Sequence, residues 1–236
     1  MIKIENVEVV GWEPAIRGMR NPMNSWHLSD SYPAVDCGKC GKIERDGICD
    51  AKDRDCTDFE CYEIGPNDHN LMMRLANGGP VHAKYRRMIV VYADITCHHT
   101  WWAEFDTYKV GTVRNSCSKM HKIHVKGFVK DDFSTEGIDE VSIDHPEVAE
   151  QFERVLDTLE WLRVKFNETG EKKYWRAMIE LLPMGFNIKA TVMLNYEVLT
   201  NIYNSRDHHK VFEWTEVCRW IETLPSSEII TGKGDK

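Results

Sequence analysis

The polar stretch between residues 107 and 124 holds the side chains best suited to contact a phosphate. Lys109, Arg114 and Lys119 fall within eleven residues, and hydroxyl and amide side chains lie between them. Cationic side chains donate charge-assisted hydrogen bonds to phosphate oxygens, and hydroxyls add ordinary ones. A solvated loop has a similar composition, so the pattern indicates either a phosphate-binding loop or a plain surface loop.

A helix and a strand are expected to position this stretch. Trp101, Trp102, Phe105 and Tyr108 recur at spacings of three and four residues, the period of one helical face. Gly111 is expected to end the helix, since glycine tolerates the left-handed backbone of a helix end. Residues 88–96 alternate apolar and polar side chains as a strand does, and would lead the chain into this helix.

Two arginines form a second candidate anion-binding group. Residues 1–10 alternate as a strand, and Arg17 and Arg20 follow in an expected loop that contains Pro22. A guanidinium can bind a carboxylate or a phosphate through two parallel hydrogen bonds. Surface ion pairs are the competing interpretation for both side chains.

Residues 33–62 are rich in cysteine and poor in large apolar side chains. Five of the eight cysteines lie there, and such a segment buries too little apolar surface to fold without a cross-link or a metal. The two residues between Cys37 and Cys40 let both thiolates face one tetrahedral ion. Structural zinc, an iron–sulfur cluster, and free or disulfide-bonded cysteines remain open. The candidate metal ligands are Cys37, Cys40, Cys49, Cys56 and Cys61.

The composition is that of a soluble globular protein. The chain has 236 residues, of which 42% are hydrophobic and 29% charged. A net charge of −8 argues against broad binding to nucleic acid, which needs a basic face. No apolar run approaches the roughly 20 residues that span a bilayer, and the N-terminus lacks the apolar core of a signal peptide. We therefore expect a cytoplasmic protein that binds neither nucleic acid nor membrane.

The C-terminal half is expected to be mostly helical. A long helix should begin at Pro146 and end at Gly170, with one continuous apolar stripe between them. Shorter helices are expected over residues 172–182, 196–204 and 210–223, and a strand over 185–194. Residues 127–145 should form a surface excursion, and the tail from Ser226 should be frayed. An α+β fold follows, with a sheet packed against long helices.

The spacing of residues 107–120 matches a known signature. Thr107-Tyr108-Lys109 stands in place of Arg-His-Arg, Thr112 in place of a serine, and Arg114-Asn115 in place of Asn-Glu; Cys117 or Ser118 then takes a second serine position, and Lys119-Met120 takes Arg-Tyr. Leu182-Pro183, Asn195 and Arg206 keep the spacing of a later Leu-Pro, Asn and Arg. In this pattern the chain resembles the flavin-dependent thymidylate synthases over most of residues 67–225.

The resemblance implies the fold, reaction and partners of that family. The fold would be one domain over residues 1–236, with a mixed or antiparallel sheet, long helices, and residues 33–62 as a Cys-rich insertion. Members of the family convert dUMP to dTMP with a methylene group from methylene-tetrahydrofolate and hydride from FAD, which NADPH reduces. They assemble as homotetramers. The implied cofactor is FAD, with zinc an open addition.

The resemblance also assigns site residues. Arg206 would act at the pyrimidine ring as the catalytic cation, with Glu104, Ser116, Ser118 and Lys119 binding the nucleotide. Thr107, Tyr108, Lys109, Thr112 and Asn195 would contact the flavin, and Trp101, Trp102 and Tyr108 could stack on flavin or folate rings.

Two departures from the signature oppose parts of this assignment. A carboxylate at Glu104 would repel a phosphate. The replacement of two arginines and a histidine removes charge that would hold the flavin diphosphate. The alternative is a non-catalytic nucleotide-binding or interaction protein on the same fold, with a metal bound at residues 37–61.

Overall fold

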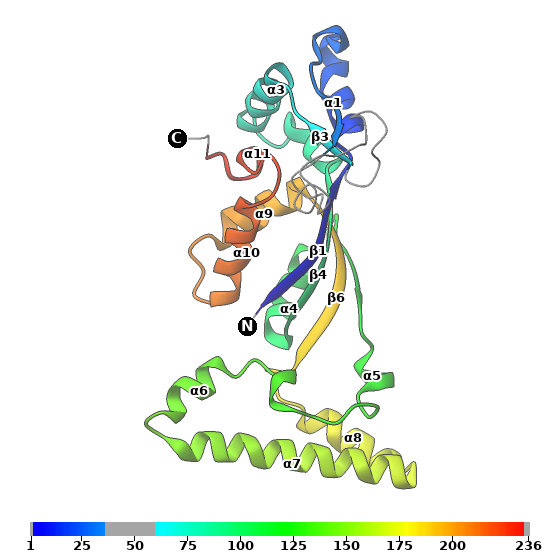
Figure 1. Cartoon of the computed structure of the whole chain (residues 1–236), viewed down its shortest axis with the longest axis vertical. Coiled ribbons are helices and arrows are strands. Elements are labelled where there is room, and N and C mark those ends of the chain that lie inside the picture. Colours follow the sequence, from blue (N-terminus) through cyan, green and yellow to red (C-terminus); the bar gives the residue numbers. More distant parts are fainter. Residues whose placement is uncertain (1, 36–59, 234–236) are drawn as a thin grey trace, which may run out of the picture. The chain divides into compact units, whose positions relative to one another are not determined.

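The computed structural model describes residues 2–35 and 60–233 and divides the chain into two compact units (Figure 1). The first unit comprises residues 1–8, 91–194 and 208–217, and the second comprises residues 9–90, 195–207 and 218–236. The proposal that residues 1–236 act as one domain stays a prediction. Most of the expected insertion, residues 33–62, lies outside the described residues.

A four-stranded sheet carries the elements around the polar stretch. Its strands are β1 (Lys3–Val10), β4 (Val90–His98), β6 (Asn187–Asn195) and β5 (Val113–Ser116), in that spatial order. β5 pairs with β6 in antiparallel register, with Val113 opposite Met193 and Ser116 opposite Ala190. Alternate residues of β4 and β6 are buried, as the period of a strand requires. Together with the helices described in the next paragraphs, this sheet confirms the predicted α+β class.

Strand β5 corrects the expectation of a loop after Gly111. All four of its side chains are exposed, so no apolar alternation marks it as a strand in the sequence. Its pairing with β6, which satisfies the backbone groups on that side, makes it a strand.

The helices of the first unit pack around an apolar cluster. Helix α7 (Pro146–Thr169) begins at Pro146 and is capped at Gly170, as predicted, and the φ of Gly170 is 69°, the left-handed geometry that glycine provides at a helix end. Helices α7 and α8 (Lys172–Leu181) lie side by side (Figure 1) and bury Phe152, Leu159 and Met178 with Phe133. The other helices of this unit are α4 (His99–Phe105), α5 (Lys119–Lys122) and α6 (Glu136–Ser142), with turns of 3-10 helix over Asp106–Tyr108 and Lys130–Asp132. Helix α6 lies in the expected surface excursion.

The second unit contains α1 (Trp12–Arg20), a two-stranded ribbon of β2 (Tyr32–Val35) and β3 (Glu60–Glu63), and α3 (Pro66–Asn77). It also holds α9 (Tyr196–Arg206), α11 (Glu228–Thr231) and 3-10 turns over Asn21–Met23, Trp26–Leu28 and Ala83–Arg87. Helix α10 (Phe212–Glu222) begins in the first unit and ends in the second.

Two expectations in the second unit were wrong. Residues 17–20 end helix α1 instead of forming a loop, because Trp12, Ala15, Ile16 and Met19 bury one helical face. The tail is not frayed at α11, where Ile229 and Ile230 are buried.

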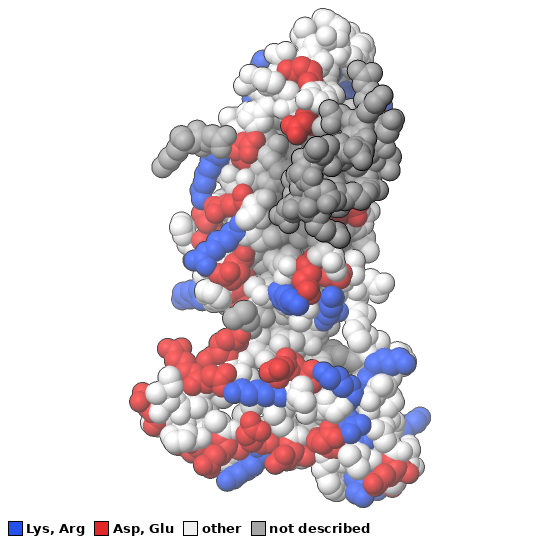
Figure 2. All heavy atoms as spheres, viewed as in Figure 1, with Lys and Arg blue, Asp and Glu red and all other residues white. Residues whose placement is uncertain are grey.

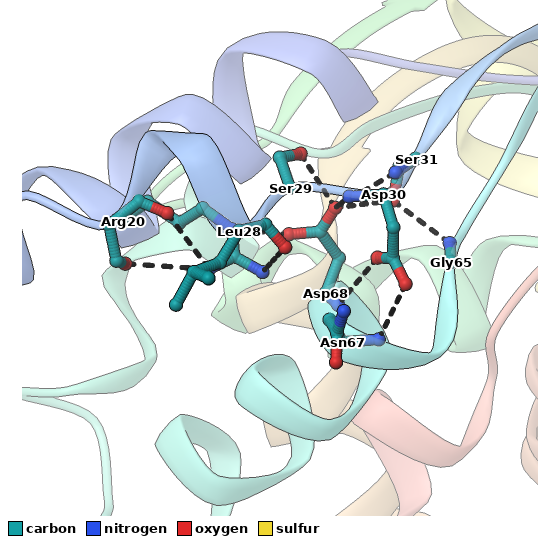
Figure 3. Close-up of polar contacts among 9 residues, drawn as sticks. Arg20, Leu28, Ser29, Asp30, Ser31, Gly65, Asn67 and Asp68 are labelled. Atoms are coloured by element: carbon teal, nitrogen blue, oxygen red, sulfur yellow. Dashed lines mark hydrogen bonds and ion pairs between the residues drawn. The ribbon is translucent and has the colours of Figure 1, made fainter.

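A buried ion pair anchors the second unit (Figure 3). The Nε of Arg20 lies 2.5 Å from Oδ1 of Asp68, and the two side chains are 4% and 0% exposed. The hydroxyls of Ser29 and Ser31 each donate to Oδ2 of Asp68 at 2.7 Å. Arg20 also donates to the carbonyl of Leu28 at 3.1 Å. The competing interpretation of a surface ion pair is therefore wrong for Arg20, since its partner lies in the interior.

Arg17 differs from Arg20 in its surroundings. Its guanidinium lies 3.7 Å from the carboxylate of Glu13 one turn earlier, and both side chains are about two-thirds exposed. An exposed pair of this kind contributes about 0.5 kcal/mol or less.

Charged side chains of both signs lie on the surface of the protein (Figure 2). On the face drawn in Figure 2, acidic and basic side chains are interspersed, including along the lower part of the view where α7 runs (Figure 1). None of the described helices is long and apolar enough to cross a membrane.

Candidate functional site

Helix α4 is held in place by an aromatic cluster of the first unit. Trp101 and Trp102 are buried, and their ring centroids lie 4.9 Å apart. Trp101 also stacks on Phe105 at 5.1 Å and packs against Trp214 of α10 at 5.0 Å. The suggestion that Trp101 and Trp102 stack on a flavin or folate ring is therefore wrong, because both rings are enclosed by protein.

Glu104 lies at the edge of this cluster and contacts α10. Its Oε2 accepts a hydrogen bond of 2.7 Å from the indole Nε1 of Trp214 and lies 3.9 Å from Nε2 of His209. The ring of Tyr108 meets Trp214 edge-on at 5.8 Å. The structure thus brings Glu104 and Tyr108, two predicted site residues, around one tryptophan. Trp214 and His209 were not predicted as neighbours of Glu104.

The turn that follows α4 uses its hydroxyls locally. Thr107 donates to the carbonyl of Glu104 at 2.7 Å, and Thr112 donates to the carbonyl of Tyr108 at 2.8 Å. Both oxygens can still accept a hydrogen bond, but their protons are already shared. Lys109 is exposed, and no ion-pair partner for it is found within residues 2–35 and 60–233. Lys109 is thus the cation of this turn best placed to meet a phosphate.

Arg114 on β5 is fixed by two neighbours. Its NH2 lies 3.2 Å from Oδ2 of Asp106, and its guanidinium lies over the ring of Trp102 at 4.8 Å. A cation held on an aromatic face gains about 0.5–2 kcal/mol, so the orientation of Arg114 is defined before any ligand arrives.

The residues proposed for the nucleotide phosphate follow Arg114 along the chain. Ser116 is the last residue of β5, and it and Ser118 are exposed. Lys119 is the first residue of α5, and its side chain lies outside the description. The backbone therefore presents the two serines together at the end of one edge strand.

The predicted residues of the C-terminal third lie at the two ends of α9. Asn195 caps this helix, because its Oδ1 accepts the backbone N–H of Val198 at 3.0 Å. Arg206 is half-buried in the last turn. Since the helix has eleven residues and rises about 1.5 Å per residue, these two positions are about 16 Å apart along its axis. Within one chain, the backbones of Asn195 and Arg206 therefore lie at opposite ends of α9.

The metal prediction is supported nowhere in the described part of the chain. No group of three or more His, Cys, Asp or Glu side chains that could hold a metal ion is present among these residues. Cys61 lies on β3, opposite Ala34 of β2. Cys37, Cys40, Cys49 and Cys56 lie outside the described residues.

Two solved structures superpose on nearly the whole chain. Thymidylate synthase X (ThyX) from Helicobacter pylori, in a crystal structure with FAD and dUMP, gives a TM-score of 0.62 at 14% identity, over 98% of this chain and 97% of that one. A second structure of flavin-dependent thymidylate synthase ThyX from Helicobacter pylori, complexed with FAD and dUMP, gives 0.59 at 14% identity, over 96% and 97%. This chain has the fold of the flavin-dependent thymidylate synthases.

The resemblance seen in the sequence is thus confirmed at the level of the fold. No protein-family model matches the sequence, and no curated protein is detectably similar to it. An identity of 14% carries the fold and no single residue role. The assignments of Arg206, Glu104 and the flavin-binding residues stay predictions.

Proposed function

We propose that this protein methylates C5 of a pyrimidine nucleotide, converting dUMP to dTMP with methylene-tetrahydrofolate and a reduced flavin. The observation that supports the proposal is the nearly full-length fold match to proteins whose structures contain FAD and dUMP. NADPH would supply the electrons, and the chain would assemble as a homotetramer in the cytoplasm.

Arg206 and Glu104 take complementary roles at the nucleotide in this proposal. Arg206 places a fixed cation at the pyrimidine, where it would stabilise negative charge that develops on the ring during attack. Glu104, whose carboxylate already accepts from Trp214, suits an N–H of the base better than a phosphate, because like charges repel. Ser116, Ser118 and Lys119 would bind the phosphate through hydroxyl donors and a cation.

The flavin would be held through Lys109, with Thr107, Tyr108, Thr112 and Asn195 as further contacts. Among these residues only Lys109 offers a cation, so the diphosphate would be held less firmly than by a triplet of Arg-His-Arg. When bound, FAD would supply the hydride, and the protein's own groups would bind and orient the nucleotide.

The purified, untagged protein tests this function directly. We expect a flavin spectrum that persists through gel filtration or returns when FAD is added. We also expect formation of dTMP from dUMP, methylene-tetrahydrofolate and NADPH. A colourless protein that also fails to bind added FAD would contradict the proposal, and metal analysis of the same sample tests zinc and iron in residues 33–62.

A non-catalytic nucleotide-binding protein is the second candidate. The observation that favours it is the turn of residues 107–112, where two hydroxyls donate to backbone carbonyls and one lysine is the available cation. Binding of dUMP without any binding of FAD would select this candidate.

Replacing Lys109 by alanine is expected to weaken FAD binding about tenfold or more. The reason is the loss of a charge-assisted hydrogen bond to the diphosphate, which contributes about 1.5–3 kcal/mol. Titration of FAD into the parent and the variant measures the change. Lys172→Ala, an exposed lysine at the start of α8, is the matched control and should leave the affinity unchanged.

A parallel pair of titrations tests the phosphate end. Lys119→Ala should weaken the binding of dUMP and leave the binding of 2′-deoxyuridine, which lacks only the phosphate, unaffected. Unchanged affinities in both the Lys109 and the Lys119 variants would mean that residues 107–124 form a plain surface stretch.

A further inference from the structure

The first unit contains a cavity of about 270 Å³ beside the beginning of β6. The segment after β5 and the segment that follows α5 form its other walls. None of the roles proposed above uses this cavity, although Ser118 borders it. The residues around it are Cys117, Ser118, Lys122, Ile123, Lys126, Gly127, Phe128, Asp132, Phe186, Asn187, Ile188 and Lys189.

The inner wall of the cavity is apolar and aromatic. Ile123 and Ile188 are buried, and Phe128 and Phe186 are half-buried with ring centroids 6.4 Å apart at an angle of 67°. Rings set at such an angle offer one face and one edge to a neighbour, the arrangement that aromatic groups prefer. A flat ring is the group that this wall would accept most favourably.

The lysines at the rim differ in how far their charge is already neutralised. Lys126 lies 2.9 Å from Asp132, and Lys189 lies 3.3 Å from Asp94 and 3.5 Å from Glu5. Lys122 is exposed and has no ion-pair partner within the described ranges. Lys122 is therefore the cation at this rim whose charge is open to an incoming anion.

The acidic and polar groups at the rim do not cancel that charge. The carboxylate of Asp132 is matched by Lys126 and also accepts the backbone N–H of Val129 at 3.1 Å. The side-chain oxygen of Asn187 accepts from Ser134 at 2.8 Å, and its amide N–H groups are donors that this bond does not use. Lys122 and Asn187 thus offer one charged and one neutral donor beside an aromatic wall.

We propose that this cavity binds a small planar aromatic anion, an aryl phosphate or aryl carboxylate. The ring packs against Phe128 and Phe186, and the acidic group accepts hydrogen bonds at Lys122. The cavity volume of about 270 Å³ lies just below the roughly 300–1,000 Å³ of pockets that hold drug-sized ligands. The cavity therefore suits one ring with its acidic group and is too small for a dinucleotide. The proposal requires neither flavin nor dUMP.

Calorimetric titration of the full chain tests the proposal with phenyl phosphate and benzoate as probes. We expect at least one of them to bind more tightly than benzyl alcohol, which has the ring without the charge, and than inorganic phosphate, which has the charge without the ring. The stronger of the two identifies the acidic group. If neither aryl anion binds, or if inorganic phosphate binds equally well, the proposal is wrong.

Two substitutions separate the charge from the ring. Lys122→Ala should lower the affinity for the aryl anion about tenfold or more, because it removes a charge-assisted hydrogen bond. Lys172→Ala should leave this affinity unchanged. Phe186→Leu should also weaken it. The melting temperatures of Lys122→Ala and Lys172→Ala should match that of the parent. An equal affinity for parent and Lys122→Ala would overturn the assignment.

Cys117 gives an independent readout that requires no substitution. Its thiol is exposed and borders the cavity, whereas Cys97 and Cys218 are buried. Saturating aryl anion should slow the alkylation of Cys117 by iodoacetamide and leave that of Cys61 on β3 unchanged, as peptide mapping by mass spectrometry would measure. Alkylation of Cys117 at the same rate with and without the probe would contradict binding in this cavity, whatever the protein does with FAD.

Discussion

Replacing Asp68 by asparagine is expected to lower the free energy of unfolding by about 3–5 kcal/mol, because it leaves the Arg20 guanidinium buried without its counter-charge. The two side chains are 4% and 0% exposed and 2.5 Å apart, so neither can turn to solvent. An amide would keep the size of the side chain but lose the charge that faces Arg20 and two serine hydroxyls. Urea denaturation of the parent and the variant measures the difference.

The same carboxylate predicts how stability depends on pH. Burial alone would raise the pKa of Asp68, but hydrogen bonds from Ser31, Ser29 and Arg20 and from the backbone of Asp30 outweigh it and hold the pKa below its ordinary value. A carboxyl group with a lowered pKa in the folded state stabilises the protein above its unfolded pKa, and this contribution is lost as the pH falls through the folded pKa. The Asp68→Asn variant should lack this acid-dependent loss.

Asp157→Asn is the matched control for both measurements. Asp157 is exposed on α7, so its replacement should change stability by about 0.5 kcal/mol or less. If the two variants were equally stable, the network in Figure 3 would contribute little to the fold.

Much of the fold follows from local patterns in the sequence. The apolar stripe between Pro146 and Gly170 predicts α7 with its correct ends, because helix period, proline start and glycine end are all properties of neighbouring residues. The alternation in β4 and β6 likewise predicts two strands that bury one face.

The pairings that build the site depend on residues distant in sequence. Glu104 and Trp214 are separated by 110 positions, and Arg20 and Asp68 by 48. No spacing rule reaches across such distances, so Glu104 was predicted only as a nucleotide contact and Arg20 as part of a surface loop. His209 was visible in the sequence, but its nearness to Glu104 was not.

Trp101 and Trp102 show a further limit of composition. Their types suit both a core and a stacking platform, and only burial decides between them. Helix α4 turns both rings into the interior, where they pack with Phe105 and Trp214. Among the aromatic residues between Trp101 and Tyr108, the ring that stays half-buried is that of Tyr108.

Replacing Arg206 by alanine is expected to weaken dUMP binding at least about 30-fold, the effect of losing about 2 kcal/mol or more when one partner of a desolvated charge pair is removed. Arg206 is half-buried in the last turn of α9, so a ligand there would meet its charge in partly desolvated surroundings. Equilibrium titration of the parent and the variant with dUMP measures the loss, and activity with methylene-tetrahydrofolate and NADPH should fall at least as far.

Two companion variants separate a role in binding from a role in folding. Arg206→Lys keeps the charge but loses the planar fork of donors, so it should recover part of the affinity and not all of it. Arg154→Ala removes an exposed arginine of α7 and should leave dUMP binding unchanged. If Arg206→Ala bound dUMP as the parent does while its melting temperature fell, Arg206 would be a structural residue of α9, and the nucleotide would have to be held by other groups.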